Sequence, residues 1–117
     1  MKNSKSLGKK GEDLALDYLK KKGYDIVETN FRYDRAEIDL IARDQNVLVF
    51  VEVKARRAGT LGDPEDAVTL RKRDQIRKAA QGYLFKKHLD NAECRFDVLA
   101  IEYVAGAANI RHIEDAF

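Results

Sequence analysis

The feature that most constrains this chain is an apolar segment, residues 37–54, that has charged side chains within it. The segment has the pattern of two strands joined by a tight turn at residues 44–46. The carboxylates of Asp39 and Glu52 and the ammonium group of Lys54 stand among residues that are almost all apolar. Burying a charge is costly unless the charge is paired or bound to a cation. The fold must therefore supply these three groups with partners or with a metal ion.

The pairing register of the two strands decides whether these charges meet. Side chains alternate between the faces of a strand, so Glu52 and Lys54 point to the same face. A two-residue turn at 45–46 places Asp39 directly opposite Glu52. The same turn places Glu37 opposite Lys54. A four-residue turn keeps this register, whereas a three-residue turn sends Asp39 to the other face of the sheet.

Two carboxylates that meet in this way can share one cation, because directly opposed Cβ atoms lie roughly 4.5–5.5 Å apart. Mg²⁺ accepts one or two carboxylates, keeps several waters and binds phosphate through its remaining positions. A lysine beside it orients or deprotonates the attacking water and offsets charge on the transition state. The spacing therefore predicts metal-dependent phosphodiester hydrolysis, with Asp39, Glu52 and Lys54 as catalytic residues. The predicted metal ligands are Asp39, Glu52 and the backbone carbonyl of Val53, and Glu37 is a supporting residue that holds Lys54.

The alternative is that these charged groups form a partly buried salt-bridge network on an exposed face of the sheet. Three features favour the metal site instead. The surrounding residues are apolar, the register brings the groups together, and a basic helix follows the second strand.

The hydrophobic pattern predicts two helices and five strands. In the second helix, Ile76, Ala79 and Tyr83 recur at the spacing of a buried face. A loop containing a short turn at 63–66 precedes this helix. The predicted helices are residues 7–22 and 69–87, and the predicted strands are 24–31, 35–43, 47–55, 95–104 and 110–113. This order predicts an α/β fold with a mixed central sheet flanked by helices.

Length and composition indicate one compact domain. The 117 residues suffice for a single hydrophobic core, and residues 1–6 are predicted to be flexible. The one cysteine, Cys94, cannot form an internal disulfide, which fits a reducing cytoplasm. The chain begins without an apolar signal segment, and its longest apolar run, 47–51, is far too short to span a membrane. We therefore expect a soluble cytoplasmic protein without a membrane partner or small-molecule cofactor.

Positive charge is concentrated after the paired strands, although the net charge of the chain is only +2. Residues 54–78 contain eight basic and four acidic side chains, whereas residues 89–117 contain two basic and six acidic ones. Charge runs on helices are usually solvated faces, but these residues would rim the proposed site and contact phosphates. The predicted nucleic-acid-binding residues are Arg56, Arg57, Arg71, Lys72, Arg73, Arg77 and Lys78, and Gln75, at the border of the buried face, is predicted as a supporting residue.

Three other polar residues have ordinary structural interpretations. Asp97, at the start of an apolar strand, is predicted to cap or to pair with a neighbouring arginine. His112, in a short terminal strand, is predicted to be structural. From the residues alone, Glu12 is a first-turn acid that the helix dipole favours.

Several motifs resemble a known family. Asp39, followed by Glu52-Val53-Lys54, matches the D…E-x-K pattern of the restriction-endonuclease-like nuclease superfamily. More closely, the chain resembles the YraN-type bacterial family, which is similar to archaeal Holliday-junction resolvases. The segments that carry this resemblance are 11–15, 37–43, 49–54, 95–98 and 111–117. The chain departs from this family at Ala36, where the family usually has glycine, and this difference does not affect the chemistry.

The resemblance implies the αβββαβ core of that superfamily, Mg²⁺ or Mn²⁺ as the cofactor, and DNA as the substrate. It implies that Asp39 and Glu52 ligate the metal and that Lys54 is the catalytic lysine. It also implies that Glu12 is a helix carboxylate that reaches the metal, often through water, in place of the dipole interpretation.

We therefore expect a metal-dependent endonuclease acting on DNA, with branched or Holliday-junction DNA among its candidate substrates. Symmetric cutting of two strands would need a C₂ homodimer, for which the sequence shows no clear stripe of dimer contacts. The alternatives are a nucleic-acid-binding module that keeps the fold without turnover and a structural or adaptor protein. A module that only binds DNA does not need buried acids near phosphate, and nothing specific supports an adaptor.

Overall fold

A computed structural model describes residues 4–57 and 68–117 of the chain. The elements are α1 (Ser4–Lys21), β1 (Asp25–Tyr33), β2 (Ala36–Asp44), β3 (Val47–Arg57), α2 (Leu70–Lys86), β4 (Cys94–Val104) and β5 (Ala107–Ile113). The predicted order and the α/β class with a mixed sheet are confirmed. Helix α1 begins at Ser4, within residues 1–6, for which the sequence predicts a flexible start. The turn predicted at 63–66 lies outside the described residues.

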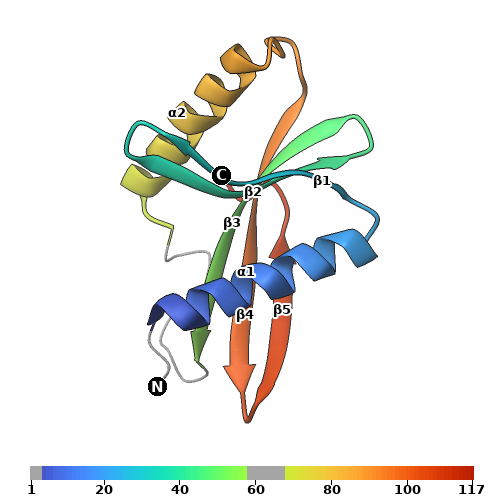
Figure 1. Cartoon of the computed structure of the whole chain (residues 1–117), viewed down its shortest axis with the longest axis vertical. Coiled ribbons are helices and arrows are strands. Elements are labelled where there is room, and N and C mark those ends of the chain that lie inside the picture. Colours follow the sequence, from blue (N-terminus) through green and yellow to red (C-terminus); the bar gives the residue numbers. More distant parts are fainter. Residues whose placement is uncertain (1–3, 58–67) are drawn as a thin grey trace.

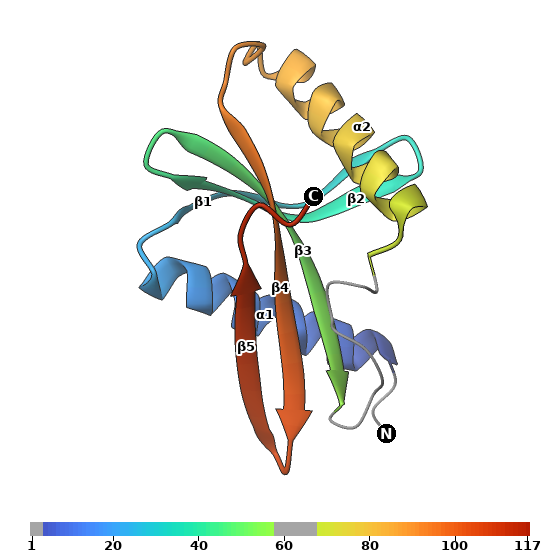
Figure 2. The same ribbon diagram turned by 180° about the vertical axis from the view of Figure 1, so that it is seen from behind.

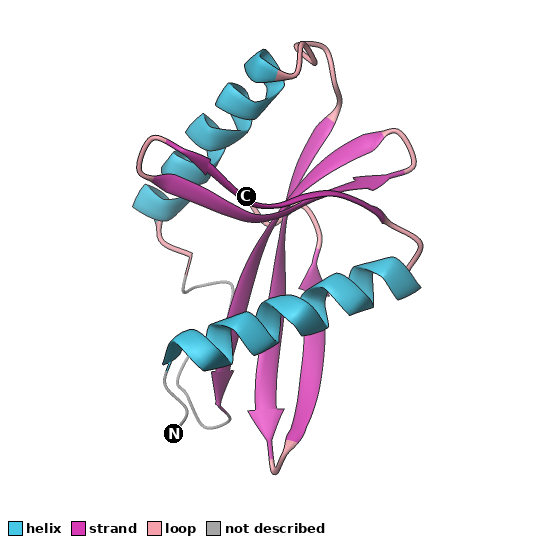
Figure 3. Ribbon diagram, viewed as in Figure 1, coloured by secondary structure: helices cyan, strands magenta, loops and turns pink. Residues whose placement is uncertain are grey.

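The five strands form one sheet in the order β1-β2-β3-β4-β5. Among the described strands, only β3 and β4 pair in parallel, and the connection between them carries α2. Helix α1 lies across the lower strands in Figure 1 and behind them in Figure 2, while α2 lies beside the β1–β2 arm. Figure 3 shows the same arrangement by element type, with the helices on opposite sides of the twisted sheet. In the described ranges, neither helix is long and apolar enough to cross a membrane.

Strand β3 supplies both hydrophobic clusters, because its side chains alternate between the faces of the sheet. Val49 and Val51 pack in the cluster under α1. Leu48 and Phe50 pack in the cluster under α2, where the Phe50 and Tyr83 rings meet edge to face. A strand buried on both faces reads as a continuous apolar run, which explains the composition of this segment.

The predicted register of the β2–β3 hairpin is confirmed. Asp44 pairs with Val47, and Leu40 pairs with Val51. Residue Gln45 has a φ of +57°, as the tight two-residue turn requires. The last pair in the ladder is Leu40–Val51, so the strands part before they reach the predicted catalytic residues. On the side of this pair away from the hairpin turn, the first residues of β2 lie near α2. The last residues of β3 instead run toward the N-terminal end of α1 (Figure 1).

Helix α1 approaches β3 closely at a glycine. A Cβ atom placed on Gly11 would lie only 2.9 Å from the Cβ atom of Ala55. Gly11 lies four residues before Ala15 and eight residues before Leu19, and all three residues are buried on the face of α1 that packs on the sheet. The glycine lets the helix backbone lie directly on the strand.

We predict that Gly11→Ala lowers the free energy of unfolding. Alanine is the better helix former by about 1 kcal/mol, but overpacking against the fixed Ala55 Cβ costs roughly 1–3 kcal/mol. Urea unfolding should therefore show net destabilisation, whereas Asp13→Ala, at an exposed position of α1, should stay within about 0.5 kcal/mol of wild type. A Gly11→Ala protein more stable than wild type would show that α1 does not rest on β3 as described.

Candidate functional site

Strands β2 and β3 part beyond the pair Leu40–Val51, and the Asp39 side chain reaches from β2 to β3 in the gap between them. Its Oδ2 atom accepts a hydrogen bond of 2.8 Å from the backbone N–H of Val53. This bond stands where the ladder would have continued. The N–H and C=O of one strand residue point to the same side of the strand. The carbonyl of Val53 therefore points toward the same gap, as a metal ligand at this position would need.

Glu52 is the acid most deeply buried at this gap, with 4% of its surface exposed. Its Oε2 atom lies 3.7 Å from the Nζ atom of Lys54 and 3.6 Å from that of Lys72. Both distances are those of ion pairs rather than of short hydrogen bonds. The predicted partner of Lys54, Glu37, instead pairs with Arg32 across the β1–β2 hairpin at 3.9 Å.

Asp39 lies close enough to Glu52 for the charge of Glu52 to raise the pKa of Asp39. Burial raises the pKa of Asp39, and the charge of Glu52 and a hydrogen bond with its carboxyl raise it further. The Val53 N–H opposes this rise, and the pKa of Asp39 settles at about 8. The raised pKa of Asp39 therefore favours the protonated carboxyl in the metal-free protein. A bound cation would compensate the two carboxylates and displace that proton.

Glu12 reaches the same region from α1. Its Oε1 atom accepts a hydrogen bond of 3.1 Å from the side-chain amide of Asn30. Burial raises the pKa of Glu12, the Asn30 bond lowers it, and the charges of Asp39 and Glu37 raise it again. Beside it lies a pocket of about 170 Å³ that is lined by Glu12, Asp13, Leu16, Thr29, Asn30 and Leu40. The charge of Asp39 therefore reaches Glu12, although Asp39 does not line this pocket.

The donor set fits a cation that keeps much of its own water. Within the described residues, no three acidic, histidine or cysteine side chains come close enough together to hold a metal. Two carboxylates do meet, and Mg²⁺ is commonly held by one or two carboxylates plus waters. The residues that could hold such an ion directly are Asp39, Glu52 and the carbonyl of Val53, and a link from Glu12 through water stays a prediction.

The predicted nucleic-acid-binding residues of α2 separate into different places. Lys72 meets Glu52 at the gap. Arg73 and Arg77 lie instead over the ring of Phe117, at 5.6 and 5.4 Å. Arg71 and Lys78 are exposed, while Arg56 and Arg57 form the end of β3 just beyond Lys54. Gln75 lines a pocket near the β1–β2 turn rather than joining the carboxylates.

The sequence predicts Lys72 as a phosphate contact but does not predict its position against Glu52. The helix cap explains this position. The Thr69 hydroxyl accepts a hydrogen bond of 3.2 Å from the backbone N–H of Lys72, which fixes the first turn of α2. The parallel crossover returns this turn to the edge of β3. A basic residue in the first turn, where the helix dipole disfavours it, was the one available signal.

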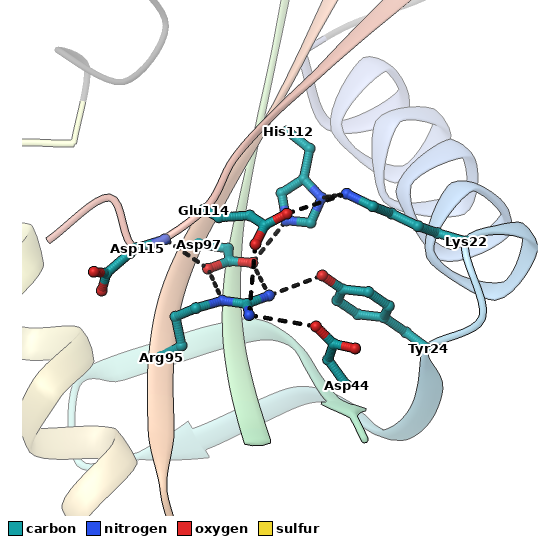
Figure 4. A network of polar contacts seen from close by, with 8 residues as sticks. All are labelled: Lys22, Tyr24, Asp44, Arg95, Asp97, His112, Glu114 and Asp115. Carbon is teal, nitrogen blue, oxygen red and sulfur yellow. Dashed lines mark hydrogen bonds and ion pairs between the residues drawn. The ribbon is translucent and has the colours of Figure 1, made fainter. Parts of the chain in front are cut away.

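A second polar cluster surrounds the fully buried Asp97 (Figure 4). Its carboxylate accepts hydrogen bonds from Arg95 at 2.9 and 3.0 Å and from the Asp115 N–H at 3.0 Å. The Nε2 atom of His112 lies 2.7 Å away, and the His112 Nδ1 atom lies 2.8 Å from the Nζ atom of Lys22. Because an ammonium group only donates, Nδ1 accepts and Nε2 donates to Asp97.

This cluster is structural, as the sequence predicts for Asp97 and His112. Burial alone would raise the pKa of Asp97, but the hydrogen bonds from His112, Arg95 and the Asp115 N–H lower it below its ordinary value. Arg95 extends the network to the Tyr24 hydroxyl at 2.8 Å. The cluster thus joins β4, β5 and the chain end to the start of β1, and every acceptor of the buried acid is in use.

Comparison with known proteins identifies the family. The model of the uncharacterised protein family UPF0102 matches residues 11–101. The chain belongs to this family. The UPF0102 match includes every residue of the gap described above, from Glu12 to Lys72. This membership confirms the YraN-type resemblance.

Several UPF0102 relatives align over nearly their whole length. The protein from Geotalea uraniireducens is 50% identical over 116 residues, which cover 98% of this chain and 91% of the relative. The protein from Geobacter metallireducens is 48% identical over 115 residues, covering 98% and 94%. The protein from Christiangramia forsetii is 44% identical over 117 residues, covering 100% and 98%.

We predict that Asp39→Asn stabilises the metal-free protein above neutral pH. An unfolded aspartate titrates near ~3.9, and the folded pKa is about 8. The native state therefore binds more protons between these values, and wild-type stability falls as the pH rises through this window. Urea unfolding in EDTA should show Asp39→Asn gaining on wild type by up to about 4 kcal/mol from pH 5 to pH 8.5.

The control for this prediction is Asp13→Asn, which removes an exposed carboxylate from α1. Its stability should track that of wild type across the pH range. If the difference between Asp39→Asn and wild type does not change with pH, Asp39 does not titrate in this window.

Proposed function

We propose that this protein is a metal-dependent endonuclease that hydrolyses DNA phosphodiester bonds. The observation that carries the proposal is the meeting of two acids and a lysine in the gap between β2 and β3. Glu52 is buried, Asp39 shares a hydrogen bond with it, and Lys54 forms an ion pair with it. Acids that are brought together in this way call for a cation, and phosphodiester hydrolysis uses one.

The cation would be Mg²⁺ or Mn²⁺, held by Asp39, Glu52 and the carbonyl of Val53. When bound, it supplies a water of lowered pKa and neutralises charge on the phosphate. The Val53 N–H keeps the Asp39 carboxylate turned into the gap. Lys54, positioned by Glu52, orients the attacking water and offsets charge on the transition state.

A second lysine supports the choice of an anionic substrate. Lys72 brings another positive charge to within 3.6 Å of the Glu52 carboxylate, although a structural ion pair needs only one. When a cation takes over the Glu52 carboxylate, both lysines become available to phosphate oxygens. Arg56 and Arg57 continue the basic surface along β3 and would contact the neighbouring phosphates.

The substrate we propose is DNA, with branched DNA included. The protein would act in the cytoplasm, where a free, half-buried Cys94 stays reduced. Cutting both strands of a junction symmetrically would need two copies of the site and hence a homodimer. A monomer would instead nick one strand.

A binding module without turnover is the second candidate. Lys54 and Lys72 both lie within ion-pair distance of Glu52, so they offset its charge without a metal. In that case the gap is a structural salt bridge, and the basic surface alone meets DNA.

We predict Mn²⁺-dependent cleavage in a panel of linear duplex, flap and four-way-junction DNA. Glu52→Gln and Lys54→Ala should each lower the cleavage rate by roughly 10²–10³-fold, because each removes a group that acts on the reacting atoms. Their affinity for uncleaved DNA in EDTA should change little. The control variant is Asp17→Asn, which removes an exposed acid of α1 and should cleave like wild type.

The outcomes separate the candidates. Binding without cleavage of any substrate would favour the binding module. Cleavage that survives in Glu52→Gln would place the active site elsewhere. A protein that neither binds nor cleaves DNA would contradict both candidates.

A further inference from the structure

The two-residue turn between β1 and β2 forms a separate pocket with α2. Tyr33 pairs with Ala36 across this turn, so the aromatic side chain stands at its base. The pocket holds about 180 Å³ and is lined by Tyr33, Asp34, Arg35, Ala36, Gln75 and Lys78. Pockets for drug-sized ligands span roughly 300–1,000 Å³. A site of this size suits one planar ring better than a whole cofactor.

Tyr33 is held in place from one side and open on the other. A Cβ atom placed on Gly82 would lie 2.3–2.7 Å from three carbon atoms of the Tyr33 ring. The ring therefore rests directly on the backbone of α2, with no side chain between them. Nevertheless, 47% of the Tyr33 surface remains exposed. An aromatic ring that is both positioned and exposed is a preorganised surface for stacking.

The polar groups of the pocket suit a nucleotide. The Gln75 amide carries both donors and an acceptor, so it can bond to the edge of any base. Arg35 and Lys78 contribute two positive charges against the one negative charge of Asp34. A ring to stack on, an amide to read an edge and excess positive charge match a nucleobase with its phosphate.

The pocket lies beside the proposed active site along α2. Gln75 and Lys78 follow Lys72 by three and six residues, which is about 4.5 and 9 Å along the helix axis. Stacked nucleotides repeat every ~3.4 Å along a strand. A base in the pocket would thus lie roughly one to three nucleotides from the phosphate at the carboxylates. Ala36, which lines the pocket, leads directly into the strand that carries Asp39.

We propose that Tyr33 stacks an unpaired nucleobase next to the phosphodiester bond that the protein cleaves. Gln75 bonds to the edge of this base, and Lys78 and Arg35 contact its phosphate. The inference rests on the proposed function and narrows its substrate class. Bases inside a duplex already stack on one another and offer no free face to Tyr33. The substrate is therefore DNA with an unpaired base, such as a flap or an open junction, rather than uninterrupted duplex.

The test compares two DNAs of equal length in EDTA, where metal-dependent cleavage does not occur. One is a blunt duplex, and the other is a flap with 2-aminopurine at the first unpaired position. Fluorescence anisotropy should show that Tyr33→Ala weakens flap binding by roughly 5- to 150-fold and leaves duplex binding within twofold of wild type. The 2-aminopurine fluorescence, quenched by stacking in the wild-type complex, should recover in this variant.

Two further variants separate stacking from loss of folding. Tyr33→Phe keeps the ring and should bind like wild type, because stacking does not use the hydroxyl. Phe85→Ala removes an exposed aromatic residue of α2 that lies outside the pocket. Phe85 is 78% exposed, and this variant should also bind like wild type. Gly82→Ala keeps Tyr33 but displaces its ring, so it should weaken flap binding without affecting the duplex.

The inference fails if Tyr33→Ala binds the flap as tightly as wild type, or if flap and duplex lose affinity equally. It also fails if wild type does not prefer the flap. These outcomes can be distinguished from the outcome of the cleavage assay that tests the proposed endonuclease. Flap binding that depends on Tyr33, without any cleavage, would support this inference and contradict the proposed nuclease. Cleavage, together with flap binding that Tyr33→Ala does not weaken, would support the nuclease and contradict this inference.

Discussion

The hydrogen bond from the Val53 N–H to the Asp39 carboxylate is the contact on which the site depends. It forms just beyond Leu40–Val51, the last pair of the β2–β3 ladder. If the ladder continued, the Val53 N–H would bond to a backbone carbonyl, and the Asp39 carboxylate would have no place between the strands. The parting of the strands therefore creates both the space for the carboxylates and the donor that orients one of them. It also frees β2 to swing toward α2, where it builds the pocket under Tyr33.

Two buried acids of this protein show how surroundings separate a structural carboxylate from a candidate site. Asp97 accepts bonds from an arginine, a histidine and a backbone N–H, and its pKa is lowered. Asp39 has one backbone donor and faces another acid, and its pKa rises to about 8. A carboxylate whose oxygens accept a full set of hydrogen bonds has no free position at which to bind a cation. A pair of acids short of donors is what a cation site requires.

Much of the fold follows from local patterns in the sequence. The apolar run of β3, the alternation along the hairpin and a two-residue turn suffice to predict the register of β2 against β3, and the observed ladder follows it as far as Leu40–Val51. The parting of the strands was not predictable, because it depends on how β2 twists around the core. Ile38 and Ile41 are three residues apart, yet both pack under α2, which simple alternation forbids. The same twist directs Glu37 to Arg32 rather than to Lys54.

Contacts between segments that are distant in the sequence are the other feature that the sequence does not predict. The contact of Lys72 with Glu52 depends on how the crossover connection returns α2 to the sheet. The contact of Tyr33 with Gly82 depends on where the β1–β2 turn lies relative to α2. Neither pair is related by a local period. The acids and the lysine of the D…E-x-K pattern were predictable because one hairpin carries all three.

The central claim is that Asp39 and Glu52 together form a cation site, and a Mn²⁺ titration followed by electron paramagnetic resonance tests it most directly. Wild type should bind one Mn²⁺ ion, Asp39→Asn and Glu52→Gln should each weaken this binding by at least roughly tenfold, and Asp13→Asn should bind like wild type. Equal binding by all four proteins, or no binding by wild type, would contradict the claim.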